Sequence, residues 1–261
     1  MTYQYIELDI NDKIATLWLN RPELHNAFNS GVIAEISHAL QAVNAMGDVR
    51  VLVLAGRGKS FSAGADLNWM KAAGEASFDD NMADAVNLAA MLHTLFTLSK
   101  PTIARVHGAA IGGGLGLAAA CDICVASDTA SFATSEVKFG LAPSTISPYV
   151  IRAIGERTAK RYFLTAERMN AHTACRIGLV HEVCEMDELD NTISTIAHTL
   201  CQNAPKAITQ AKNLIDTVAN QTIDDDLQTY TAHHIASLRQ SDEAKSGLQA
   251  FLTKGTPNWL Q

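Results

Sequence analysis

Residues 102–122 read TIARVHGAAIGGGLGLAAACD. The first five residues are typical of a short strand, and the small and apolar residues from Gly113 onward predict a helix. The first N–H groups of a helix have no partner within it, and the helix dipole favours negative charge beside them. The segment therefore predicts a strand, a glycine loop and a helix start that can hold an anionic oxygen.

The glycine run matches neither of the common nucleotide motifs. A phosphate loop would continue with Gly-Lys-Ser/Thr, which is absent here. A dinucleotide fingerprint starting at Gly112 would need a third small residue where Leu117 stands. Binding of a nucleotide phosphate by these motifs is therefore not expected.

A second glycine loop lies upstream, in residues 51–67, which read VLVLAGRGKSFSAGADL. Its first five residues form an apolar run, as expected for a strand that is buried on both faces. The small residues around Gly64 let a ligand approach the backbone, although an ordinary tight turn would look the same. Two such loops, each after a buried strand, predict two convergent N–H donors that can stabilise one oxygen.

Outward from these loops the pattern is that of an α/β protein. Residues 3–10 and 14–19 predict a hairpin, residues 32–45 and 83–98 predict helices, and residues 123–126 predict a strand. Nearly everything after Pro148 reads as helix. We expect a core with parallel strand pairing over residues 1–195, and a helical region over residues 196–261 that serves as a cap or in oligomerisation.

Composition excludes several classes of protein. The formal net charge of −7 argues against a nucleic-acid binder, which must neutralise phosphates. The five cysteines form no compact framework, and no His/Cys/Asp cluster has metal-ligand spacing, so we expect free thiols and no metal. No signal peptide and no apolar run of about 18 residues is present, so we expect a cytoplasmic protein without a membrane span.

Several motifs together resemble the enoyl-CoA hydratase/isomerase (crotonase) family. They are LNRPE at 19–23, FSAGAD at 61–66, SKP at 99–101, GGGLGLAAACD at 112–122 and GLQAFLTK at 247–254. They occur in the family's order and cover essentially the whole chain. The resemblance implies a spiral of strand–strand–helix units with a C-terminal helical trimerisation region, and a homotrimer or a hexamer made of two trimers.

The resemblance also implies a site for an acyl-CoA thioester, with coenzyme A entering as part of the substrate and no other cofactor. It places the oxyanion hole at the N–H groups of Ala65 and Gly113. It places coenzyme A against two groups of residues: Arg21, His25, Ala27, Ala63, Gly64, Asp66 and Leu67 within the chain, and Phe251 and Lys254, which would reach the coenzyme A of a neighbouring subunit.

Glu136 is the predicted acid/base residue, because it occupies the position of a catalytic glutamate in the family. A second family glutamate would stand at Gly116, which has no side chain, so a mechanism with two glutamates is in doubt. His93 could supply a second acid/base group, although an exposed or packed helix histidine is the more common case.

We therefore expect a hydratase that adds water to the α,β double bond of a branched enoyl-CoA. Residues 140–162 resemble the branch that acts on 3-methylglutaconyl-CoA or γ-carboxygeranoyl-CoA, in leucine and acyclic-terpene breakdown. Because such substrates carry a second carboxylate, the acyl-end candidates are Ser144 and Arg152, with space left at Gly116. A Δ3,Δ2-enoyl-CoA isomerase and a weakly catalytic CoA- or RNA-binding relative remain alternatives.

Overall fold

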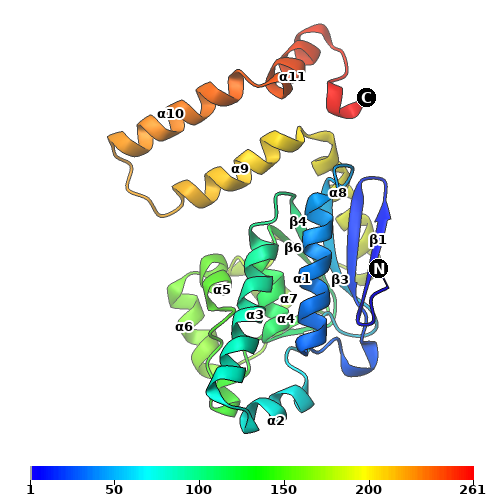
Figure 1. Cartoon of the computed structure of the whole chain (residues 1–261), viewed down its shortest axis with the longest axis vertical. Helices are drawn as coiled ribbons and strands as arrows, with labels where there is room; N and C mark the ends of the chain where they lie inside the picture. The colour runs from blue at the N-terminus through cyan, green and yellow to red at the C-terminus, as the bar shows by residue number, and fades with distance from the viewer. Residues whose placement is uncertain (1) are drawn as a thin grey trace.

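A six-stranded mixed sheet forms the centre of the computed structural model, which describes residues 2–261. The strand order is β1-β2-β3-β4-β6-β9 (Figure 1). Only the hairpin of β1 and β2 is antiparallel, and the other neighbours run parallel. The strands are β1 (Ile6–Asn11), β2 (Ile14–Leu19), β3 (Val51–Gly56), β4 (Thr102–Val106), β6 (Ile123–Ser127) and β9 (Glu182–Cys184).

The predicted buried strands are confirmed, because every residue of β3 and β4 is buried. A second, three-stranded sheet has the order β5-β7-β8 and consists of β5 (Ala109–Ile111), β7 (Ser131–Ala133) and β8 (Met169–Asn170). The four consecutive strands β4, β5, β6 and β7 alternate between the main sheet and the small sheet. The region after Pro148 is largely helical, as predicted, but it also contains the unpredicted strands β8 and β9, because strands of two or three residues are too short to show a strand period.

Helices cover both faces of the main sheet. The larger apolar core packs one face against α1 and its neighbours, and α8 covers part of the other face through Leu189, Ile193 and Ala197. The helices of the core are α1 (Ser30–Ala45), α2 (Leu67–Glu75), α3 (Phe78–Phe96), α4 (Gly113–Ala120), α5 (Ser147–Ile154), α6 (Glu156–Thr165), α7 (Ala171–Arg176) and α8 (Leu189–Gln202). Short 3-10 turns occur at η1 (Pro22–Leu24), η2 (Glu136–Phe139), η3 (Met186–Glu188) and η4 (Asn258–Leu260).

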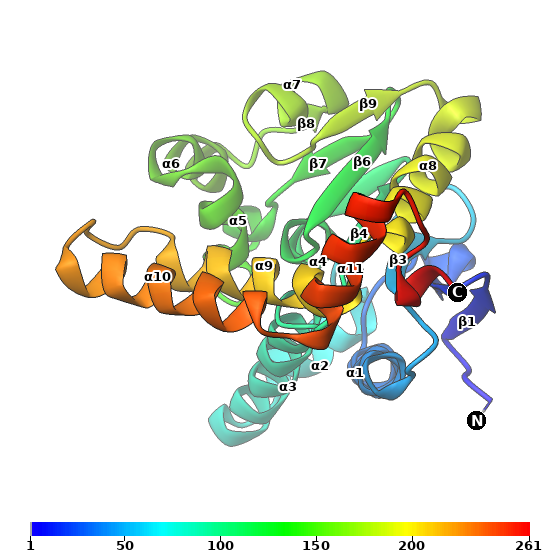
Figure 2. The same cartoon turned by 90° about the horizontal axis from the view of Figure 1, so that it is seen from above.

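The last three long helices form an arm: α9 (Pro205–Val218), α10 (Asp225–Arg239) and α11 (Asp242–Thr253). The arm stands away from the sheet, and α10 runs back along α9 in the opposite direction (Figures 1 and 2). The predicted boundary after residue 195 falls inside α8, whose buried face packs on the sheet. The break between core and arm therefore lies after α8 rather than within it.

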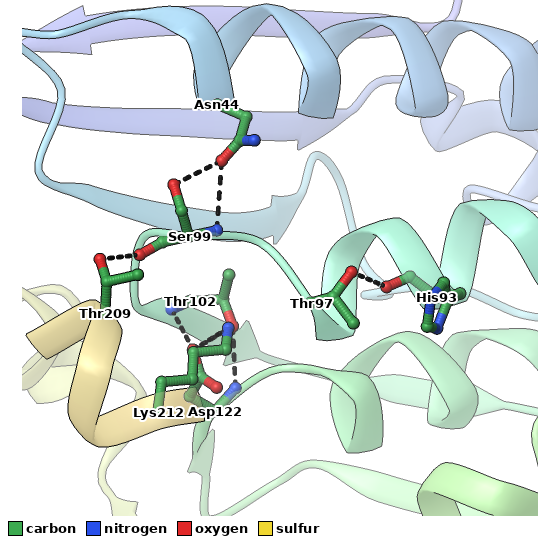
Figure 3. Close-up of polar contacts among 8 residues, drawn as sticks. All are labelled: Asn44, His93, Thr97, Ser99, Thr102, Asp122, Thr209 and Lys212. Atoms are coloured by element: carbon green, nitrogen blue, oxygen red, sulfur yellow. Dashed lines mark hydrogen bonds and ion pairs between the residues drawn. The ribbon is translucent and has the colours of Figure 1, made fainter. Parts of the chain in front are cut away.

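Polar contacts join the base of the arm to the core (Figure 3). Thr209 of α9 donates its hydroxyl to the carbonyl of Ser99 at 2.7 Å. Lys212 of α9 pairs with Asp122 at 2.8 Å, and the same carboxylate accepts the backbone N–H and the hydroxyl of Thr102. Asp122 thus connects β4, the start of β6 and the arm, in accord with a structural rather than a chemical role.

No helix within residues 2–261 combines the length and the apolar character needed to span a membrane.

Candidate active site

Two backbone N–H groups from distant segments meet at the start of α4. Gly64 has φ +89°, and a Cβ at this position would lie 2.7 Å from the carbonyl oxygen of Ile111 and 3.6 Å from the nitrogen of Gly113. Only a glycine fits this approach, which brings the 61–67 loop against the start of α4. Among residues 2–261, no protein acceptor is hydrogen-bonded to the N–H of Ala65 or Gly113. Both donors are therefore available to an oxygen of a ligand, and their role as an oxyanion hole stays a prediction.

Hydrogen bonds on both sides hold the 61–67 loop in place. On one side, Ser62 exchanges backbone bonds with Ala109 and Ile111 around β5, at 3.0 and 2.9 Å. On the other side, Phe28 donates its N–H to Gly64 at 2.7 Å and accepts the N–H of Asp66 at 2.8 Å. Because Ala65 lies between these last two bonds, its N–H direction is fixed before any ligand arrives. Preorganised donors of this kind are what an oxyanion hole requires.

An ion pair secures the end of the loop. Arg21 donates to Asp66 at 3.1 Å, and both side chains are largely buried. Asp66 also caps α2 by accepting the N–H groups of Asn68 and Trp69. Burial alone would raise the pKa of Asp66, but these two N–H groups and the Arg21 guanidinium outweigh it and lower the pKa below its ordinary value. Asp66 is therefore an ionised structural residue, and Arg21 is engaged within the protein.

A cavity of about 270 Å³ opens beside the two donors. It is lined by Phe28, Ala63, Gly64, Ala65, Leu67, Trp69, Met70, Leu88, Gly112, Gly113, Ser135, Glu136, Phe139, Leu141, Ala142, Pro143, Ser144, Thr145 and Ile146. The ring of Trp69 is fixed by donation of Nε1 to Asp84 of α3 at 2.8 Å. Whole-ligand pockets usually measure about 300–1,000 Å³, so this volume suits the acyl end of a thioester rather than an entire acyl-CoA.

Glu136 is the one ionisable side chain among the residues from 2 to 261 that line this cavity. It opens η2 directly after Ser135, and its Oε2 is buried with no hydrogen-bond partner. Burial raises the pKa of Glu136 above its ordinary value, and the backbone N–H groups of Glu136 and Ser135 offset this only in part. A buried carboxylate oxygen without a partner is costly for stability, and a carboxyl whose pKa is raised by burial in a cavity is typical of a proton-transfer group.

The residues predicted to bind coenzyme A fall into two places. Ala63, Gly64 and Leu67 line the cavity, and Leu67 is 79% exposed at its mouth. Behind them, the carbonyl of His25 accepts the N–H of Ala63 at 2.9 Å, and its ring contacts Ser60 at 3.1 Å. Ala27 is buried next to Phe28 and accepts a bond from Arg21. Phe251 and Lys254 lie in and just after α11, at the end of the molecule opposite α2 (Figure 1).

The three residues predicted to lie near the acyl end occupy different places in the structure. Ser144 lines the cavity, but Gly116 does not. Arg152 lies elsewhere: its guanidinium pairs with Asp216 of α9 at 2.8 Å and stacks over Phe96 at 5.4 Å. The expectation that Arg152 faces the acyl end is therefore wrong for this chain, because α5 turns that side chain toward the arm. His93 is exposed and also lies outside the cavity lining.

Comparison with known proteins decides the family. The family model described as enoyl-CoA hydratase/isomerase matches residues 9–261. The chain belongs to this family. It is 33% identical to the short-chain-enoyl-CoA hydratase of Clostridium acetobutylicum, over 97% of each protein. It is 30% identical to the trans-2-decenoyl-acyl-carrier-protein isomerase of Streptococcus mutans, over 99% of each.

The fold agrees with solved enoyl-CoA hydratases. The crystal structure of an enoyl-CoA hydratase from Shewanella pealeana superposes with a TM-score of 0.96 and 40% identity, covering 98% of this chain and 96% of that one. This α/β crotonase fold, with its helical C-terminal region, is the one expected from the sequence. The chain is thus an enzyme of the enoyl-CoA hydratase/isomerase family.

Sequence reasoning missed Trp69 and Ile146, which line the cavity of this family member. Trp69 follows the 61–67 loop by two residues, so proximity to the loop was a usable signal. No local pattern indicated Ile146, since its role depends on a contact with Gly116, which lies far from it in the sequence.

Proposed function

We propose that this chain hydrates the α,β double bond of an enoyl-CoA, with Glu136 as the single acid/base residue. One observation carries the proposal: Glu136, whose Oε2 is buried without a hydrogen-bond partner, lines the same cavity as Ala65 and Gly113, whose N–H groups have no protein acceptor. The chemistry of a thioester needs both parts, since its enolate must be stabilised and a base must be within reach.

In this mechanism the thioester oxygen accepts hydrogen bonds from Ala65 and Gly113. The Glu136 carboxylate takes a proton from water while the water oxygen bonds to Cβ, and the π electrons of the double bond move onto the thioester oxygen as an enolate. The enolate then collapses, and the protonated Glu136 returns a proton to Cα. One water molecule is added and Glu136 is regenerated. Loss of one oxyanion donor from such a site costs about 3 kcal/mol of barrier.

For the acyl group we propose a branched chain, as the resemblance of residues 140–162 indicates. The hydroxyls of Ser144 and Thr145 line the cavity and could donate to a second carboxylate. The lining residues among 2–261 include no lysine or arginine, so hydroxyl groups rather than a cation would hold a second carboxylate. A substrate panel that pairs 3-methylglutaconyl-CoA with uncharged enoyl-CoA esters of similar length would test this part of the proposal.

A Δ3,Δ2-enoyl-CoA isomerase is the second candidate, and the lone carboxylate favours it. Glu136 alone could take a proton from Cα of a 3-enoyl-CoA and return it to Cγ, without any water. The isomerase from Streptococcus mutans acts on an acyl-carrier-protein substrate by its name, so both reaction types occur among the relatives.

The deciding experiment is Glu136→Gln, assayed with 2-enoyl-CoA and 3-enoyl-CoA separately. Proton transfer by a positioned side chain contributes about 10²–10⁴-fold, so we expect a loss of that size while acyl-CoA binding, followed by calorimetry, persists. The matched control is Glu75→Gln, which changes an exposed carboxylate at the end of α2. Full activity of the Glu136 variant would sink the proposal.

A further inference from the structure

A close contact between α4 and the start of α5 closes the cavity wall beside Glu136. Gly116 lies in α4, and a Cβ built there would be 2.2 Å from Cγ2 of Ile146 and 2.8 Å from its Cβ. Ile146 is 2% exposed and stands at the N-cap position of α5. Because a β-branched side chain has few rotamers with which to move aside, residue 116 must be glycine as long as residue 146 is isoleucine.

The same edge of α4 also meets the carboxylate of Glu136. A Cβ at Gly112 would lie 3.1 Å from Glu136 Oε1, and Gly116 donates its N–H to the carbonyl of Gly112 at 3.0 Å. Positions four residues apart along a helix are separated by about 6 Å. Glu136 thus approaches the N-terminal end of α4 at Gly112, Ile146 approaches the helix at Gly116, and both residues line the cavity.

Ile146 is apolar, whereas a second polar group at its position would help hydration. Hydration needs a water molecule held beside Glu136, and Ile146 offers it no hydrogen bond. Isomerisation needs no water, since the proton that leaves Cα returns to Cγ of the same molecule. We propose that Ile146 is a specificity-determining residue that sets the ratio of hydration to isomerisation at Glu136, an inference that rests on the proposed function.

The test compares Ile146→Val with Ile146→Thr. Valine and threonine have the same shape, so the pair isolates the effect of one hydroxyl beside Glu136. A hydrogen bond of ordinary strength corresponds to about a fivefold change, and we expect the hydration-to-isomerisation ratio to rise by that factor in the threonine variant relative to valine. The ratio is measured from kcat/KM for 2-enoyl-CoA hydration and 3-enoyl-CoA isomerisation, with melting temperatures as a check on folding.

A second measurement tests the contact itself. Gly116→Ala should lower the melting temperature in the wild-type background. The same substitution should lower the melting temperature less in the Ile146→Ala background, where the Cγ2 atom that would lie 2.2 Å from the new Cβ is absent. Gly74→Ala is the matched control, because nothing lies within 4 Å of a Cβ at that exposed helix position.

The outcomes separate this inference from the proposed function. Equal ratios in the valine and threonine variants, while Glu136→Gln still abolishes turnover, would overturn the role of Ile146 alone. An equal cost of Gly116→Ala in both backgrounds would overturn its structural basis. Full turnover by Glu136→Gln would instead overturn the proposed function and, with it, the inference built on it.

Discussion

At the scale of single residues, Glu136 shows the conflict between stability and chemistry. Its Oε2 is buried without a partner, and burial raises its pKa. A buried polar group without a partner costs on the order of 1–3 kcal/mol. Within residues 2–261, Glu136 is the position with a buried side-chain oxygen that lacks a partner, and it lines the same cavity as two backbone donors without protein acceptors.

The raised pKa of Glu136 predicts how the stability of the protein depends on pH. Because its pKa is raised, Glu136 binds its proton more tightly in the folded state than in the unfolded state. This proton binding contributes fully to the free energy of unfolding below the pKa of the unfolded state. The contribution is lost as the pH rises through the pKa of the folded state. Glu136→Gln should therefore melt above the wild type at pH 7.5, by about 2–4 °C for each kcal/mol recovered. The difference should disappear near pH 4, where both states of the wild type are protonated.

Thermal melts at the two pH values, with Glu75→Gln as control, check this expectation. A variant that melts at or below the wild-type temperature at pH 7.5 would show that the buried carboxylate is not the source of instability.

At the scale of elements, the proposed oxyanion hole depends on a loop and a helix that approach through their backbones. The 61–67 loop is bonded to β5 on one side and to Phe28 on the other, and Asp66 joins it to α2 and Arg21. No side chain forms the two donors, so replacing Ala65 or Gly113 by any residue other than proline leaves the N–H in place. The hole is disturbed by changes that move the loop.

The substitution Gly64→Ala should move the 61–67 loop. The added Cβ would meet the carbonyl oxygen of Ile111 at 2.7 Å at φ +89°, which forces Ala65 away from Gly113. Removal of one oxyanion donor lowers kcat by about 10²–10³, and we expect a loss within that range. Steady-state kinetics beside Gly74→Ala check the expectation, since that helix position has open space and gains helix propensity. Unchanged kcat in a folded Gly64→Ala protein would contradict the assigned hole.

At the scale of the whole molecule, the arm exposes apolar side chains. Ile223, Leu248, Phe251 and Leu252 are 82%, 57%, 83% and 76% exposed. Figure 1 shows the arm standing off the core. A homotrimer or a dimer of trimers, as predicted from the resemblance, would cover such a surface, and the assembly remains a prediction. The −7 net charge of the chain gives no support to an RNA-binding role.

A charge placed on this surface tests the assembly. Leu248→Asp combined with Phe251→Asp should shift the protein to the mass of a monomer, because burying an unpaired carboxylate is costly. Light scattering after size-exclusion chromatography gives the mass, and Gln249→Asp is the control at an exposed polar position of the same helix. A wild-type protein that is itself a monomer, or a double variant of unchanged mass, would contradict the predicted assembly.

The sequence by itself determined the parts whose signals are local. Buried apolar runs marked β3 and β4, helical periods marked α1 and α3, and the two glycine loops predicted a pair of donors. Glu136 was reached through family position rather than through any local pattern. The strands β8 and β9 escaped detection because two or three residues show no period.

Only the tertiary structure decided the surroundings of Glu136, the proposed acid/base residue. Whether Arg152 faces the cavity depends on the direction of α5, and its pairing with Asp216 joins residues 64 positions apart. The space at Gly116 is taken by Ile146, which lies 30 positions further along the chain and closes the wall only because α5 packs on α4. Periodicity and motifs describe neighbours along the chain, whereas these contacts arise from helix packing, so they become visible only when the chain is folded.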